Sequence, residues 1–191
     1  MVSSSFIIVF LLALLVVSAT NSKAQADRVN PLLPTCKTVG GGSTSTYFGI
    51  DFCMSALGSD SRSHDAAGYR DISIIAVDLV KANATCTGAK IGGLLKAGAG
   101  AGGKDDDATT ESLLSCQALY SGIVDLLPGC AAAIKGGKMD QAALSLEKAA
   151  SAAKECDDVF RKNKVASPLT AEDDSAFKLA KLAVALLGFA G

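Results

Sequence analysis

One segment, residues 139–160, constrains the fold more than any other part of the chain. Its apolar side chains recur at alternating steps of three and four residues: Met139, Ala142, Leu146, Ala149, Ala153, Cys156 and Phe160. This spacing places every member on one face of an α-helix. A helix with a single apolar stripe must bury that stripe against other helices. The segment therefore predicts a helical bundle.

Three further segments have the same character. The first begins at Tyr69, and its predicted inward face is Ile72, Ile75, Leu79, Ala82, Cys86, Ala89 and Gly93. The second carries Leu113, Cys116, Tyr120, Ile123, Leu127 and Ile134, with a kink expected at Pro128. In the last, Thr170 and Asp173 resemble a helix cap, and the helix should end near Leu187. Four long helices with short connections predict an all-α, up-down-up-down four-helix bundle.

The chain begins with an apolar run at 6–19, which small residues follow at 24–26. The run is shorter than the roughly 20 residues that a membrane-spanning helix needs. Residues 1–26 are therefore predicted to be a cleaved signal peptide, with an uncleaved signal anchor as the alternative. The expected mature domain is 27–191, comprising an N-terminal hairpin (27–68) and the bundle (69–191). After cleavage the protein is expected to be secreted and to have no membrane contact.

The charge of the chain argues against one class of partner. The sequence holds 18 Lys and Arg against 19 Asp and Glu, and signal cleavage removes only Lys23 of these. Proteins that bind nucleic acids carry concentrated basic patches. No nucleic-acid partner is therefore expected.

The six cysteines all lie in the predicted mature part, and an even number in a secreted chain favours disulfides. If the second and third helices turn near residue 136, Cys116 and Cys156 lie at the same height on facing stripes and can pair. Cys36 and Cys53 are then left to close the Gly-, Ser- and Thr-rich opening stretch into a hairpin. This hairpin is interpreted either as a brace against the bundle or a neighbouring molecule, or as a simple clamp.

Cys86 and Cys130 do not fit the same geometric test. In a straight bundle they would lie about 18 Å apart along the axis. They are predicted to be buried free thiols that pack as small apolar residues. They could pair only if the chain folds back at Pro128.

The sequence holds no convincing catalytic or metal-binding pattern. Its only histidine, His64, stands between Ser63 and Asp65, whereas the members of a catalytic triad converge from separate segments. There is no CxxC pair to indicate zinc. The chain is therefore expected not to be an enzyme and to need no cofactor or metal. Asn83-Ala84-Thr85 is a sequon, which makes Asn83 a candidate for N-glycosylation.

The layout of the chain resembles the plant invertase and pectin methylesterase inhibitors, including their pollen-allergen members. The matching segments are CKTV…YFGIDFC in the front hairpin, FCMSALGSDSRS leading into the bundle, LLSCQALYSGIVDLL, EKAASAAKECDDVF, and SPLTAEDD before the last helix. The resemblance covers the whole expected mature chain. Its usual four cysteines correspond to Cys36, Cys53, Cys116 and Cys156, which leaves Cys86 and Cys130 as additions.

The resemblance implies an extracellular inhibitor of the cell wall, or apoplast, that blocks a carbohydrate-active enzyme by binding it. Invertase inhibitors of the family can carry a Pro-Lys-Phe motif at the turn between the second and third helices. Here that turn reads Gly137-Lys138-Met139, so pectin methylesterase is slightly preferred over acid invertase as the target. Lys138, Met139 and Asp140 are the candidate target contacts. The alternatives are a secreted helical carrier of a lipid or other apolar ligand, and a storage or allergen-type protein with no target.

Overall fold

The computed structural model describes residues 32–41, 46–98 and 104–191, and the predicted signal peptide with its cleavage site lies outside them. The described residues form helices and no strand. The elements are α2 (Leu32–Gly40), α3 (Ile50–Gly58), a 3-10 turn (Ser61–His64), α4 (Tyr69–Gly98), α5 (Lys104–Lys135), α6 (Met139–Lys162) and α7 (Thr170–Leu187).

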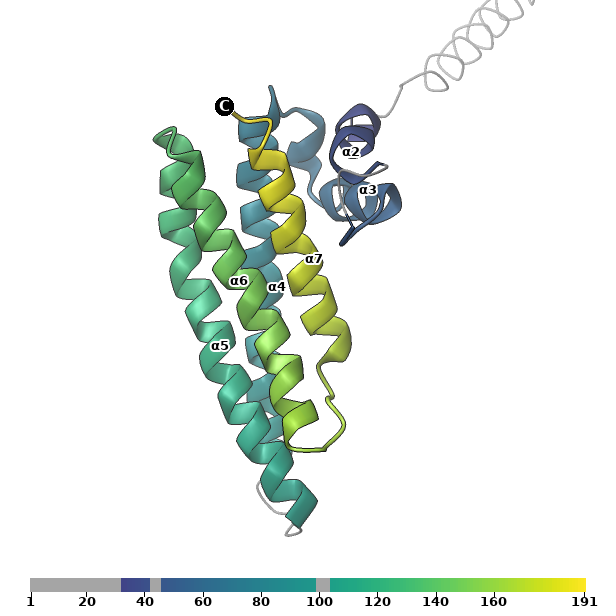
Figure 1. Cartoon of the computed structure of the whole chain (residues 1–191), viewed down its shortest axis with the longest axis vertical. Helices are drawn as coiled ribbons and strands as arrows, with labels where there is room; N and C mark the ends of the chain where they lie inside the picture. Colours follow the sequence, from purple (N-terminus) through teal and green to yellow (C-terminus); the bar gives the residue numbers. More distant parts are fainter. Residues whose placement is uncertain (1–31, 42–45, 99–103) are drawn as a thin grey trace, which may run out of the picture.

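The four long helices α4 to α7 form an up-down-up-down bundle (Figure 1). Each of them packs mainly on two neighbours, so that α4 contacts α5, α5 contacts α6, α6 contacts α7, and α7 returns to α4. Helix α5 continues through Pro128 to Lys135. The predicted fold class is confirmed.

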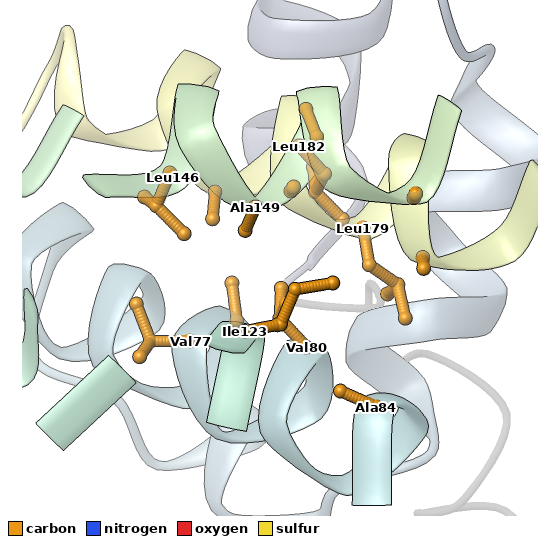
Figure 2. Close-up of a cluster of buried hydrophobic side chains, with 14 of the residues drawn as sticks. Val77, Val80, Ala84, Ile123, Leu146, Ala149, Leu179 and Leu182 are labelled. Atoms are coloured by element: carbon orange, nitrogen blue, oxygen red, sulfur yellow. The ribbon is translucent and has the colours of Figure 1, made fainter. Parts of the chain in front are cut away.

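All four helices contribute to one hydrophobic core. In Figure 2, Val77, Val80 and Ala84 of α4 lie with Ile123 of α5 opposite the side chains of α6 and α7, among them Leu146, Ala149, Leu179 and Leu182. The stripe predicted for α6 is buried from Ala142 to Phe160, and Met139 is partly buried at its start. Many of the buried residues are alanines, each of which removes little apolar area from water at about 25 cal/mol per Å². The larger side chains therefore decide which face of a helix turns inward.

In helix α4 the larger side chains decide which face is buried, and that face differs in part from the predicted one. Of the predicted inward positions, Ile72 and Ile75 are buried and Leu79 is partly buried, whereas Ala82, Cys86, Ala89 and Gly93 are exposed. Beyond its first turns the helix buries Val80, Thr87 and Ile91 in their place. The bundle buries more apolar surface by enclosing the branched Val and Ile side chains than by enclosing Ala, Cys and Gly. The small-residue stripe consequently faces outward.

Helices α2 and α3 form the expected N-terminal hairpin, which the Cys36–Cys53 disulfide closes with a Cα–Cα distance of 5.6 Å. The hairpin packs against α4 and α7, on the side of the bundle away from α5 (Figure 1). The Tyr47 ring meets Phe177 of α7 edge-on at 5.4 Å, and Lys181 lies 4.8 Å over the Tyr47 ring. The hairpin is thus a brace on one face of the bundle and leaves α5 and α6 open on their outer side.

The turns at the ends of α5 and α6 use the same hydrogen-bond pattern. Lys138 N–H bonds to the Ala133 carbonyl at 2.8 Å across Gly137, whose φ is +74°. Val165 N–H likewise bonds to the Phe160 carbonyl across a left-handed residue. Glycine suits this conformation because it has no Cβ, so Gly137 sets where α5 ends and the next helix begins.

The start of α7 differs from the predicted cap. The helix begins at Thr170 as expected, but its N-cap residue is Leu169 and no side chain caps it. Asp173 turns into the core and bonds to α5 in place of capping its own helix. The Thr170/Asp173 pattern therefore predicted the start of the helix correctly. Its prediction that Asp173 caps the helix was wrong.

Helices α4 and α5 are both long and apolar enough, by length and composition, to cross a membrane. A core helix of a bundle meets the same criterion, because one of its faces must be apolar. Both helices use that face against neighbouring helices here.

Candidate functional site

The outer side of the α5–α6 pair carries an open groove of about 560 Å³. We call it the α5–α6 groove. Small residues line its middle, among them Ala118 and Gly122 of α5 and Ala152 of α6. Leu119, Leu126 and Val159 form its apolar walls, and Lys148 and Glu155 supply its charges. The groove is a shallow apolar surface with a charge of each sign beside it, which suits contact with another macromolecule.

The Cys116–Cys156 disulfide links the two helices at one end of this groove. Its Cα–Cα distance is 4.9 Å, and both residues are fully buried. The cross-link fixes the relative position of α5 and α6 before any partner arrives. Binding on this face therefore avoids the entropy cost of ordering two helices.

The turn with the three candidate contact residues is a separate surface at the shared end of α5 and α6. Lys138 and Asp140 are exposed there, and Met139 is half-buried against the core. Lys138 is the N-cap residue of α6, and no ion pair to it is found within the described ranges. At 1.5 Å per residue, the ten residues from Lys138 to Lys148 place the turn about 15 Å from the near end of the groove. A partner can therefore use one surface without the other.

The two free cysteines differ in their surroundings. Cys130 is buried, and its thiol donates a hydrogen bond to the Ala142 carbonyl at 3.6 Å. Burial raises the pKa of Cys130 to about 11. Cys86, expected to be buried, is exposed because α4 turns its small-residue stripe outward. The expectation is thus wrong for Cys86.

We expect an alkylating reagent at pH 8 to modify Cys86 in the native protein within minutes and to leave Cys130 unmodified until the protein unfolds. The reason is that only an exposed thiol can deprotonate and react readily. Peptide mass mapping without reduction measures both sites. A Cys86→Ser variant should lose all native labelling, and labelling of Cys130 in that variant would contradict the assigned burial.

Asn83 lies in a groove between α3, α4 and α7, together with Cys86. Its Nδ2 atom, to which a glycan would be attached, donates a hydrogen bond of 3.3 Å to Ser175 Oγ on α7. A glycan at Asn83 would have to leave the chain through this groove. Occupancy of the sequon stays a prediction that the intact mass of the protein purified from its source tests.

The Ser63, His64 and Asp65 side chains do not converge. Ser63 is buried, whereas His64 and Asp65 are exposed, so the three consecutive residues point to different surroundings. Among the described residues, no three His, Cys, Asp or Glu side chains are grouped so that they could hold a metal ion. The Ser63-His64-Asp65 run therefore does not form the convergent arrangement that a catalytic triad needs.

Sequence reasoning missed one buried polar contact. Tyr120 of α5 donates its hydroxyl hydrogen to Asp173 Oδ1 of α7 at 2.7 Å in the core. A signal for it existed, since Asp173 falls at helical spacing with the apolar positions Leu169, Ala176 and Ala180. An acid at an inward position predicts a buried carboxyl group with a polar partner.

The fold and its surfaces define a class of protein: a disulfide-linked helical bundle with an open apolar groove on two cross-linked helices. The chain belongs to the plant invertase/pectin methylesterase inhibitor family, whose profile matches residues 34–186. Proteins of this family inhibit enzymes and are not enzymes themselves. They are generally extracellular.

Two curated relatives are similar over most of their length. A "Putative invertase inhibitor" of Platanus orientalis is 27% identical over 158 residues, which cover 82% of this chain and 88% of the relative. The protein of the same name from Platanus acerifolia is 28% identical over 158 residues, covering 82% of this chain and 83% of the relative.

Proposed function

We propose that residues 27–191, released by cleavage after Ala26, form a secreted inhibitor of the cell wall that binds a carbohydrate-active enzyme and blocks it. The target is pectin methylesterase or acid invertase. The observation that carries the proposal is the preformed α5–α6 groove, an open apolar surface on two helices that a buried disulfide holds in register. Membership of an inhibitor family supports the same reading.

Two observations bear on the choice of target, and they point in different directions. The turn at Gly137-Lys138-Met139 has neither the rigid proline nor the planar phenylalanine of the Pro-Lys-Phe motif, which slightly favours pectin methylesterase. The names of the two relatives refer to invertase. Titrating the purified protein against both enzymes decides between them. Lack of inhibition of either enzyme at micromolar concentration would refute the proposal.

The alternative function, a carrier of a lipid or other apolar ligand, receives less support from the shape of the protein. Carriers enclose most of the surface of an apolar ligand in a concave site. The α5–α6 groove is open along its length and shallow. Uptake of a fluorescent fatty acid, competed by unlabelled lipid, would favour the carrier.

The turn and the groove give a test that separates the two targets. We expect Lys138→Glu to weaken inhibition of invertase at least tenfold, or about 1.4 kcal/mol, because the reversed charge would oppose carboxylates at the invertase active site. Pectin methylesterase inhibition through the groove should stay within about twofold of the parent, since the turn lies outside the groove. Inhibition constants of both enzymes measure the effect.

A matched control for this variant is Lys135→Glu, which makes the same charge change at an exposed site one turn earlier on α5. The melting temperature of Lys138→Glu should equal that of the parent, because Lys138 is exposed. Lys135→Glu places an acid in the last turn of α5, where the helix dipole favours a basic residue, so its melting temperature should fall slightly. Equal inhibition of invertase by Lys138→Glu and parent would remove the turn from the mechanism.

A further inference from the structure

The Tyr120–Asp173 contact bridges α5 and α7, which otherwise pack mainly on other helices. Asp173 is 3% exposed and Tyr120 is fully buried. Oδ1 of Asp173 accepts the tyrosine hydrogen bond, but Oδ2 is buried and has no hydrogen-bond partner among the described residues. A buried ionised carboxylate with an unpaired oxygen is costly, and protonation removes that cost.

The nearby cations are already engaged with other groups. Lys90 of α4 bonds to Glu172 at 2.6 Å, next to Asp173 in sequence. Arg161 of α6 pairs with Asp158 and lies 3.8 Å from Asp157.

Two more cations lie close to the site. Lys154 of α6 lies over the Phe177 ring at 5.4 Å, and Lys178 pairs with Asp174 at 2.7 Å. Across the described residues, therefore, no salt bridge reaches Asp173 from α4, α5, α6 or α7.

Solvent has a route to this carboxyl group. A groove of about 310 Å³ between α6 and α7 is lined by Asp173 together with the acids Asp157, Asp158 and Asp174. Protons can exchange through this groove without unfolding of the bundle. Its acids outnumber its two basic lining residues, Lys154 and Arg161, which favours uptake of a proton over loss of one.

Burial raises the pKa of Asp173 to about 6, and the negative charges of Asp157 and Glu172 add to the rise. The hydrogen bond from Tyr120 and the positive charge of Lys90 oppose it without cancelling it. The folded state therefore holds this proton more tightly than the unfolded state, in which the pKa is close to 3.8. The bound proton therefore adds its full contribution to the free energy of unfolding at a pH below the unfolded-state pKa. This contribution decreases as the pH rises and is lost once the pH exceeds the folded-state pKa. The window of change is about pH 4 to pH 6, with no further change above it.

We propose that Asp173 is a proton-operated switch in the core of the bundle. When protonated, it forms a neutral pair with Tyr120 that joins α5 to α7. When ionised, it leaves an unpaired charge between them and loosens α5. Because α5 carries one wall of the α5–α6 groove, the part of this inference that concerns target binding rests on the proposed function.

The first test is thermal unfolding of parent and Asp173→Asn at intervals from pH 4.5 to pH 7.5. Asparagine keeps the shape of the side chain and cannot ionise. The melting temperature of the parent relative to the variant should fall by roughly 3–8 °C across this range. Asp174→Asn is the matched control, since Asp174 is adjacent and exposed, and its difference from the parent should not change with pH by more than about 1 °C.

The second test reads the proton directly and does not depend on the stability of a variant. Carbon NMR of the Asp173 carboxyl group in the parent should show a titration midpoint near 6, and Tyr120→Phe, which removes the hydrogen bond to the ionised form, should move it upward. A midpoint below 4.5, or parallel pH profiles of parent and Asp173→Asn, would overturn the inference.

The third test concerns the target enzyme. The ratio of the inhibition constant of the parent to that of Asp173→Asn should rise at least about threefold from pH 5 to pH 7, because only the parent loosens. An unchanged ratio would overturn the link to binding. If neither protein inhibits any target while the melting and NMR results hold, the proposed function fails and the switch stands.

Discussion

Replacing Gly122 with arginine is expected to raise the inhibition constant for pectin methylesterase at least about 100-fold, or roughly 2.7 kcal/mol. Gly122 is exposed, lies in the middle of the α5–α6 groove, and has no atom within 4 Å of the place where a Cβ would stand. An arginine therefore fits on α5 without strain and fills the groove that the target would occupy. The measurement is inhibition of the purified enzyme by the two proteins.

The same substitution should not harm the fold. Glycine is about 0.8–1 kcal/mol less favourable than alanine in a helix interior, whereas arginine is a good helix former. The melting temperature of Gly122→Arg should thus equal or exceed that of the parent. Gly93→Arg is the matched control, because Gly93 is exposed on α4 and also has room for a Cβ. Full inhibition by Gly122→Arg would show that the groove takes no part in binding.

Removing the Cys116–Cys156 disulfide, by changing both residues to alanine, is expected to lower the free energy of unfolding by about 4 kcal/mol. The cross-link spans 40 residues, and closing a loop of that length in the unfolded chain has an entropic effect of this size. For a domain with about 5–15 kcal/mol of total stability, the loss is large. Denaturant unfolding followed by circular dichroism measures it, and inhibition should weaken because α5 and α6 are no longer held in register.

The matching change at Cys36 and Cys53 separates general destabilisation from an effect on the binding face. That disulfide spans 17 residues and lies within the hairpin. The hairpin packs against α4 and α7. We expect its removal to loosen the hairpin and to leave the inhibition constant within about threefold of the parent at temperatures where the protein is folded. Equal losses of inhibition in the two double variants would contradict a special role for the α5–α6 link.

Much of the architecture can be predicted from local sequence patterns. The steps of three and four from Ala142 to Phe160 specify a helix and its inward face, and Gly137 marks where α5 ends. Cys116 and Cys156 lie at the same height on two antiparallel helices, and they form a disulfide in the structure. These features need only helical periodicity, turn chemistry and the rise per residue, all of which are properties of neighbouring residues in the chain.

The tertiary structure alone decided the rotation of α4, and with it the exposure of Cys86. Two stripes run along that helix at nearly the same spacing, and the choice between them depends on the apolar area that α5 and α7 can cover. The environment of Asp173 was decided in the same way, since an acid in the first turn of a helix can serve as a cap until another helix brings Tyr120 against it. The α5–α6 groove also needs both helices in place, because its walls come from residues about thirty positions apart. Each of these features depends on which surfaces meet when four helices pack, and no single helix contains that information.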